Sequence, residues 1–269
     1  MPNHYFHLDI YLKWGSIEVA KHRLVYSLLR FKLPVLSKYQ DENNGLAFDF
    51  MADDNASHKR LLTGHDNGLI TLNIEEADDV VRTMASNQMD EVYRTLLGHF
   101  RHEVGHYYWD QLIKNSARLN SFRNHFGDET IDYGEALKRH YAKTDSEDWK
   151  AQFISSYASS HPWEDWAETW AHYMHIVDTL ETGYAFGLNV NPRLTEKDPE
   201  MSARLNIDPY TAHSFEAIID RWMPLSFVMN SLNRSMGMKD SYPFVINDAV
   251  KNKLRFIHET IKGISDSFI

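Results

Sequence analysis

Two long stretches of the chain repeat apolar residues at intervals of three and four positions. The first covers residues 16–31 and stops shortly before Pro34, and the second covers residues 89–114 without a proline. This spacing is typical of a helix that buries one face, so the sequence predicts two amphipathic helices. Asn87, with Asp90 three residues later, is expected to cap the start of the second helix.

A third helix is expected over residues 164–180, because Pro162 and Trp163 suit the first turn of a helix. Further helices are expected from Ser214 to the end of the chain, where they would close the core. Within that part, residues 233–237 (Asn-Arg-Ser-Met-Gly) are interpreted as a structural turn.

Two shorter stretches, residues 46–51 and 68–74, alternate apolar and polar positions, which is typical of half-buried strands. A cluster of glycine, aspartate and asparagine at positions 64–68 indicates a turn before the second strand. The predicted fold class is therefore α+β and helix-rich. A small β-sheet precedes the helix at 89–114, and a mostly helical C-terminal lobe follows it.

Composition limits the class of protein and the cellular location that are expected. A chain of 269 residues can bury a substantial core as one domain or two lobes. No apolar run approaches the roughly 18 residues of a membrane span, and the N-terminus lacks a secretion signal. The absence of cysteine excludes disulfides and favours the cytoplasm, and the net charge of −10 argues against a nucleic-acid surface over the whole protein. We therefore expect a cytoplasmic protein that binds neither membrane nor nucleic acid.

Residues 102–106 read His-Glu-Val-Gly-His, an H-E-x-x-H motif inside the second predicted helix. Four-residue spacing puts His102 and His106 on one helix face, one turn apart, where both imidazoles can bind one Zn²⁺. Glu103 is then close enough to act on a water bound to that ion. The motif also arises by chance in a histidine-rich chain, so its context has to support this interpretation.

His99 lies on the same face one turn earlier and resembles a further ligand. At 1.5 Å per residue, however, His99 and His106 are about 10 Å apart along the helix axis, too far to meet on one ion. We expect His99 to support the site through a hydrogen bond.

A catalytic zinc site needs a third protein ligand and an open position for water. Glu164 and Glu168 are four residues apart in the third predicted helix, so both carboxylates face the same way. One can bind the metal while the other accepts an N–H from a ligating histidine. The alternative is a solvated acidic stripe, but the neighbouring Trp163, Trp166 and Trp170 favour a partly buried helix. We interpret the tryptophans 109, 163 and 166 as core residues.

The motif and the later glutamate helix resemble the gluzincin class of metallopeptidases. Residues 164–170 (EDWAETW) are similar to the ligand helix of anthrax lethal factor-like peptidases. This resemblance implies that Glu164 is the ligand and Glu168 the supporting carboxylate. It also implies that Tyr157, seven residues before Glu164, stabilises the reaction's oxyanion. Tyr133 is a weaker substitute, and Tyr157 is otherwise a loop tyrosine packed against its own segment.

A longer resemblance is to the bacterial "putative zinc-binding metallopeptidase" family. The stretches that carry it are residues 17–35, 62–79, 93–110, 164–172 and 230–245. Many members begin with a cysteine-rich, zinc-ribbon-like segment, whereas this chain has no cysteine. The resemblance implies a single zincin-like metallopeptidase domain over residues 1–269, with approximate lobes at 1–130 and 131–269.

These features together predict a zinc metallopeptidase that cleaves a peptide or protein substrate. His102, His106 and Glu164 would hold Zn²⁺, Glu103 would be general base, and Tyr157 would bind the oxyanion. Residues 69–73 are the candidate edge strand for pairing with an extended substrate. Two alternatives remain: a non-proteolytic protein with a structural or regulatory zinc site, and a zinc hydrolase of non-peptide amides.

Overall fold

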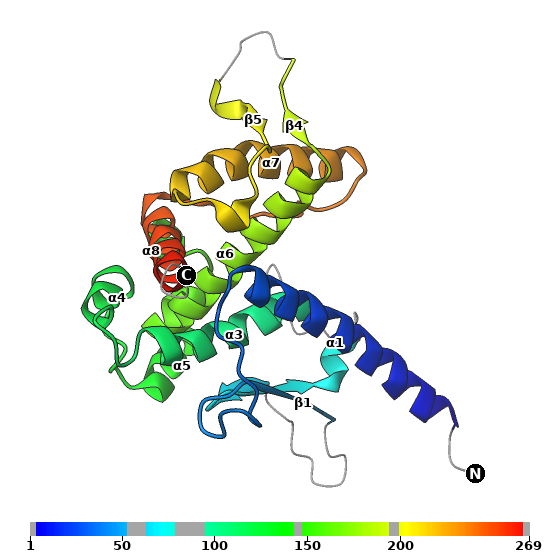
Figure 1. Cartoon of the computed structure of the whole chain (residues 1–269), viewed down its shortest axis with the longest axis vertical. Coiled ribbons are helices and arrows are strands. Elements are labelled where there is room, and N and C mark those ends of the chain that lie inside the picture. The colour runs from blue at the N-terminus through cyan, green and yellow to red at the C-terminus, as the bar shows by residue number, and fades with distance from the viewer. Residues whose placement is uncertain (1–3, 53–62, 79–94, 143–146, 194–198, 266–269) are drawn as a thin grey trace.

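The computed structural model describes residues 4–52, 63–78, 95–142, 147–193 and 199–265 (Figure 1). The long helix α6 (Pro162–Ala185) runs through the middle of the molecule, and helix α3 (Leu96–Leu112) crosses it. A small three-stranded sheet lies on the other side of α3. The chain is therefore helix-rich with a small sheet before the motif helix, as the sequence predicts. None of the described helices is long and apolar enough to cross a membrane.

Helix α1 (His4–Arg30) confirms the first predicted helix and begins earlier than expected. Its buried residues, among them Ile17, Leu24 and Leu28, recur on one face. They belong to the same core as Phe100 and Val104 of α3. The three-to-four spacing that predicted the helix thus marks the side that packs against the rest of the protein.

Helix α3 begins at Leu96, seven residues later than the predicted start of a helix at 89. Thr95 has an extended backbone (φ −115°, ψ 155°), and its hydroxyl accepts a hydrogen bond from the backbone N–H of Gly98. A capping threonine satisfies one of the free N–H groups at a helix start, so the helix begins at Leu96. The expected cap at Asn87 and Asp90 lies outside the described residues.

The sheet has the order β1–β3–β2, with β1 at Ala47–Met51, β2 at Gly64–Asp66 and β3 at Leu69–Asn73. Strand β3 pairs with β1 in parallel and with β2 in antiparallel orientation. Both sides of its backbone are thus already paired. The prediction that Leu69–Asn73 is an edge strand is wrong, and the edges of the described sheet are β1 and β2.

The turn predicted over positions 64–68 is shorter than expected. Gly64 to Asp66 form strand β2, and the chain reverses at Asn67 and Gly68, whose φ angles are 47° and 87°. Asparagine and glycine are the residues that tolerate positive φ, so the Asn-Gly pair forms the turn of this hairpin. The pattern indicated a turn but not the extra strand, because three residues are too few to show an alternation.

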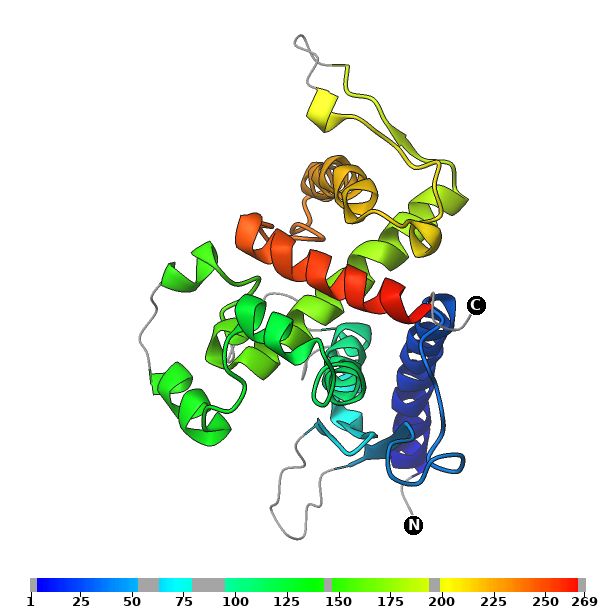
Figure 2. The same ribbon diagram turned by 60° about the vertical axis from the view of Figure 1, so that its left-hand side comes forward.

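The C-terminal half is almost entirely helical, as predicted. Helix α7 (Phe215–Ser235) is capped at Ser214, and its end passes into a turn at Gly237 (φ 75°). The turn expected at 233–237 is therefore confirmed only at its last two residues, because Asn233 to Ser235 still belong to the helix. Helix α8 lies across α6 (Figure 2), where the buried Lys253 ammonium lies 2.6 Å from a carboxylate oxygen of Asp165. The remaining elements are η1 (Ile74–Ala77), α4 (Leu119–Phe126), α5 (Tyr133–Ala142), η2 (Glu147–Ala151), η3 (Tyr157–Ser160), β4 (Asn189–Val190), η4 (Pro199–Met201), β5 (Ala203–Arg204), η5 (Pro209–Thr211), α7 (Phe215–Ser235) and α8 (Asp248–Ser265).

Helices α3 and α6 are in close contact at Gly105. A Cβ atom on Gly105 would lie 3.1 Å from the Cα of Ala167 and 3.2 Å from the Cβ of Trp170. The indole N–H of Trp166 donates to the Gly105 carbonyl at 2.8 Å. The absence of a side chain therefore lets the two backbones approach, and this contact lies within the H-E-x-x-H motif.

Gly105→Val should lower the free energy of unfolding by about 1–3 kcal/mol, because the added atoms must push α6 away from α3. Gly15→Val is the matched control: Gly15 also lies inside a helix, but no neighbour lies within 4 Å of the position of its Cβ. Urea unfolding of both variants measures the difference. Equal stability of the two would contradict the close helix contact.

Candidate metal centre

Three buried side chains from α3 and α6 converge on one point. Nε2 of His102 lies 3.1 Å from Nε2 of His106 and 3.0 Å from Oε2 of Glu164, and the third separation, His106 Nε2 to Glu164 Oε2, is 3.5 Å. The histidines come from successive turns of α3, whereas Glu164 comes from the first turn of α6. All three are buried. Within the described residues, they form a group of histidine and carboxylate ligands that could hold a metal ion.

The separations of these atoms fit a small divalent cation. Metal–ligand bonds of about 2.0–2.2 Å at tetrahedral angles place the ligand atoms of zinc about 3.3 Å apart, close to the values observed here. Oε2 of Glu164 is also buried without a hydrogen-bond partner of acceptable geometry. A buried carboxylate oxygen needs a partner, and a cation between the three atoms would supply it.

Electrostatics keeps Glu164 in the form that binds a cation. Burial by itself would raise the pKa of its carboxyl group. The electrostatic interactions with the neighbouring His106 and His102 rings outweigh burial and hold that pKa well below its usual range. Glu164 is therefore an ionised carboxylate at neutral pH.

Glu168 has the supporting position expected of the second carboxylate. Its Oε1 accepts a hydrogen bond from Nδ1 of His102 at 2.8 Å, and its Oε2 accepts one from the Ser155 hydroxyl at 2.7 Å. With its proton on Nδ1, His102 presents the lone pair of Nε2 toward His106 and Glu164. The four-residue spacing of the two glutamates thus places one at the candidate ligand position and the other behind His102.

Two tyrosines lie beside the three candidate ligands. The Tyr133 hydroxyl donates to Oε1 of Glu164 at 2.6 Å, and the ring of Tyr157 lies 5.9 Å from the ring of His102. Burial and the charge of Glu164 raise the pKa of both phenols, so both keep their protons at neutral pH. Tyr133, ranked below Tyr157 from the sequence, touches a candidate ligand directly. No spacing signal could reveal this contact, because Tyr133 is in a different helix, 31 residues before Glu164.

The predicted general base, Glu103, is buried beside the group without being part of it. Burial would raise the pKa of Glu103, but the hydrogen bond from His99 and the electrostatic interaction with the neighbouring His102 ring lower it, so the group is a carboxylate. Its Oε1 lies 3.4 Å from Nε2 of His99. His99 does not join the metal group and instead contacts Glu103, in agreement with its distance along the helix.

The tryptophans near the motif are mainly core residues, as interpreted from the sequence. Trp109 and Trp166 are buried, whereas Trp163 is half-buried and stacks against His106 with ring centroids 3.8 Å apart. This contact confines the His106 ring from one side. The indole of Trp163 therefore forms part of the wall of the site.

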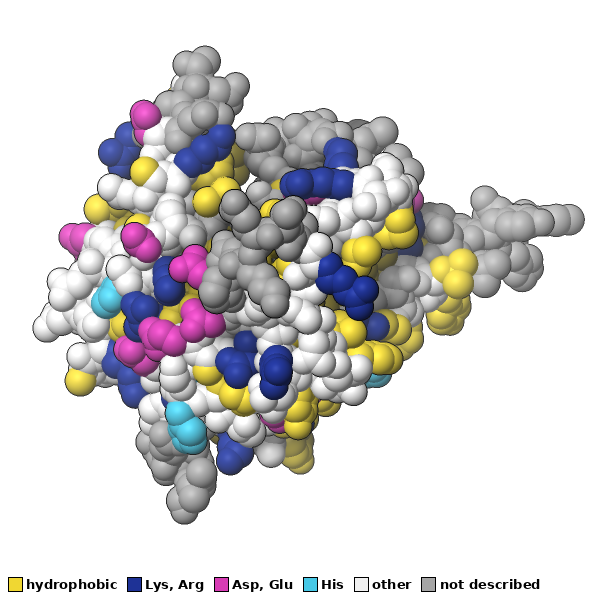
Figure 3. Space-filling model, turned by 90° about the horizontal axis from the view of Figure 1, so that it is seen from above, with side chains coloured by type: hydrophobic (Ala, Val, Ile, Leu, Met, Phe, Trp, Pro, Cys, Tyr) yellow, Lys and Arg dark blue, Asp and Glu magenta, His cyan; other side chains and the backbone are white. Residues whose placement is uncertain are grey.

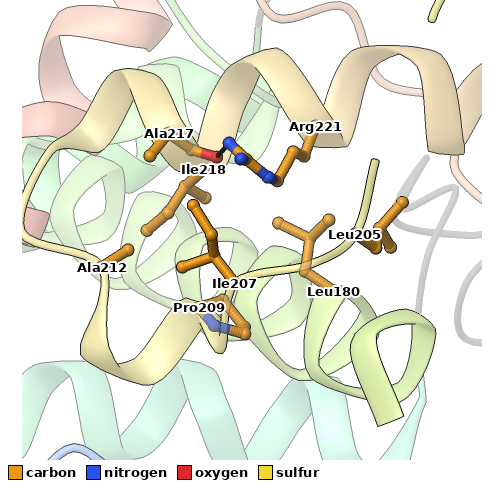
Figure 4. Close-up of a pocket in the computed structure, with 8 residues that line it drawn as sticks. All are labelled: Leu180, Leu205, Ile207, Pro209, Ala212, Ala217, Ile218 and Arg221. Atoms are coloured by element: carbon orange, nitrogen blue, oxygen red, sulfur yellow. Dashed lines mark hydrogen bonds between the residues drawn. The ribbon is translucent and has the colours of Figure 1, made fainter. Parts of the chain in front are cut away.

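A small pocket lies away from these residues, between α6, α7 and η5 (Figure 4). It is lined mainly by apolar side chains such as Leu180 and Pro209. The Arg221 guanidinium at its side is tied back to the Ala217 carbonyl at 2.7 Å. None of the candidate site residues lines it, so it is not part of the metal centre.

Comparison with known proteins supports the zinc interpretation. Residues 11–260 match a protein family described as "Putative zinc-binding metallo-peptidase". The chain is 46% identical over 257 residues to uncharacterized proteins of Mycobacterium bovis and of two strains of Mycobacterium tuberculosis. The match covers 95% of this chain and 72% of each relative. No solved structure matched the chain.

Substitution of the two α6 glutamates should separate their roles. Glu164→Ala removes a candidate ligand and should abolish stoichiometric zinc binding, whereas Glu168→Ala should weaken it about 10–100-fold. Zinc content and competition with a chromophoric chelator measure both effects. Glu135→Ala, on the exposed face of α5, is the control. If Glu168→Ala weakened zinc binding more than Glu164→Ala, the roles of the two glutamates would be exchanged. Full zinc content after both His102→Ala and His106→Ala would contradict the proposed metal site.

Proposed function

The chain belongs to the family described as "Putative zinc-binding metallo-peptidase", and on this basis we propose that it is a zinc-dependent metallopeptidase of the gluzincin type. The observation that carries the proposal is the convergence of His102, His106 and Glu164 next to the ionised Glu103. In this proposal the lobes at 1–130 and 131–269 form one zincin-like domain. The first supplies the motif helix, and the second supplies the third ligand.

A zinc ion held by the three side chains supplies Lewis acidity and a water of lowered pKa. Glu103 takes the proton of the attacking water as general base and delivers it to the leaving amine as general acid. Its ionised form at neutral pH suits the first of these steps. Glu168 keeps the proton of His102 on Nδ1, so that Nε2 stays available as a ligand atom.

Tyr157 is the proposed donor to the oxyanion that forms when the substrate carbonyl is attacked. Its ring lies beside His102, and its raised pKa keeps the phenol protonated. This assignment also rests on the resemblance of residues 164–170 to lethal factor-like peptidases. Tyr133 has a different role. Its hydrogen bond to Oε1 orients Glu164, so that Oε2 is directed at the two histidines.

The proposed substrate is an extended peptide or protein segment. Because β3 is central in the sheet, backbone pairing with a substrate would use an edge strand, and we propose β2 for this role. His65 of β2 contacts the ring of Tyr107, the neighbour of His106. The face seen in Figure 3 carries acidic and basic side chains mixed with hydrophobic ones. A cytoplasmic location and the absence of membrane and nucleic-acid partners stay predictions.

Two alternatives share parts of this site. A non-proteolytic zinc protein would need the ligands but not Glu103, and closed structural sites usually have four protein ligands, often with cysteine. A hydrolase of non-peptide amides would use the same groups on a different substrate. The buried, ionised Glu103 favours a hydrolase over a purely structural site.

Glu103→Gln should lower kcat for peptide cleavage by about 10²–10⁴-fold, because Gln cannot take the proton from water. Zinc content should stay unchanged, since Glu103 is not a ligand. Cleavage of a diverse peptide library, followed by mass spectrometry, compares this variant with wild type, with chelator-treated protein and with Glu135→Gln. Zinc-loaded wild type that cleaves no peptide would reject the peptidase proposal, and amide substrates would then be tested in the same format.

Phenylalanine substitutions should distinguish the two tyrosines. Tyr157→Phe removes the proposed oxyanion donor and should reduce kcat by about 10²–10³-fold with unchanged zinc affinity. Tyr133→Phe removes a hydrogen bond from Glu164 and should weaken zinc binding. Steady-state kinetics and zinc titration of both variants test the assignment. Loss of kcat in Tyr133→Phe alone, at full zinc occupancy, would transfer the donor role to Tyr133.

A further inference from the structure

A half-buried histidine connects the proposed general base with the β-sheet. Nδ1 of His99 lies 2.5 Å from Oε2 of Glu76, and its Nε2 lies 3.4 Å from Oε1 of Glu103. The ring therefore lies between two carboxylates, one on the 3₁₀ helix after β3 and one on α3. The His99 side chain is only 17% exposed.

This arrangement favours the imidazolium form of His99. A carboxylate oxygen is an acceptor, so a ring nitrogen facing it must carry a proton, and here both nitrogens face carboxylates. Burial would lower the pKa of His99, but Glu76 and Glu103 outweigh it and raise it to about 9. The cation thus lies between one buried and one half-buried carboxylate, and each charge has a partner.

Glu76 is itself firmly held. Its Oε1 accepts a hydrogen bond from the Thr63 hydroxyl at 2.5 Å, and the same hydroxyl accepts one from the backbone N–H of Asn73 at 3.1 Å. Asn73 also caps the 3₁₀ helix that carries Glu76, through its side-chain oxygen and the N–H of Glu75. Glu76 is thus fixed to the end of β3, next to the start of β2.

Among the described residues, His99 is the one cationic side chain within ion-pair distance of Glu103. We propose that His99, held by Glu76, is a positioning residue that anchors one oxygen of Glu103 and leaves the other free to accept the proton of the attacking water. The inference rests on the proposed function. It assigns the orientation of the base to the sheet, whereas the orientation of the ligands comes from α6.

A purely structural role is the competing explanation, in which His99 and Glu76 only attach α3 to the sheet. His99→Gln would then lower stability without a specific effect on turnover. The two explanations differ in what they predict for Glu103, so the test needs one measurement on the metal-free protein and one on the reaction.

The first measurement is NMR of ¹⁵N-histidine-labelled, metal-free protein. We expect the His99 ring to carry both protons at neutral pH, and its pKa to fall in Glu76→Gln and in Glu103→Gln. His22→Gln is the matched control and should leave the pKa of His99 unchanged, because His22 faces Glu18 on an exposed helix surface. An unchanged His99 pKa in Glu103→Gln would overturn the proposal, and this result does not depend on peptidase activity.

The second measurement is steady-state cleavage of a peptide found in the library screen. His99→Gln should lower kcat about 10–100-fold with unchanged KM and zinc content, and Glu76→Gln should change kcat in the same direction. Glu76→Gln also provides the answer if His99→Gln fails to fold. Wild-type kcat in a folded variant would overturn the positioning role. Absence of cleavage by wild type would instead reject the proposed function, and the NMR result would still decide whether His99 contacts Glu103.

Discussion

The contact between α3 and α6 at Gly105 is the constraint on which the site depends. Three ligand atoms must come within about 3.3 Å of one another, yet they belong to two helices far apart in the sequence. A side chain at Gly105 would separate the backbones, because Ala167 and Trp170 already lie at contact distance. The glycine weakens helix propensity by up to about 1 kcal/mol. In return, the histidines of one helix can reach the glutamate of the other.

Helix α6 directs its buried and half-buried acidic side chains toward several neighbouring helices. Glu164 and Glu168 face α3 and its histidines, Asp165 faces Lys253 of α8, and Asp178 accepts hydrogen bonds from Arg101 and Ser27. Since a buried charge without a partner is costly, each of these pairs also fixes how a neighbouring helix lies on α6. The candidate metal site is thus one of several polar contacts that hold the helices together, and it differs from the others in its unpaired carboxylate oxygen.

The two halves of the chain contribute differently to the proposed chemistry. The second half provides the third ligand, the carboxylate behind His102 and both tyrosines. The first half provides the motif helix and the sheet corner where Glu76 meets His99. A site formed between two halves in this way depends on their relative position, which the helix contact at Gly105 restricts. The contacts of His99 with Glu76 and Glu103 act within the first half.

The sequence by itself determined the long helices and the candidate residues of the site. Spacings of three and four residues predicted the helices, and four-residue spacing put His102 with His106 and Glu164 with Glu168 on common faces, because such patterns are properties of one helix. The resemblance implied that Glu164 is the ligand, and the structure brings this glutamate to the histidines. Only the tertiary structure decided that Tyr133 binds Glu164, that β3 is central and that His99 joins Glu76 to Glu103. These are contacts between different elements, and local periodicity holds no information on how two elements approach each other.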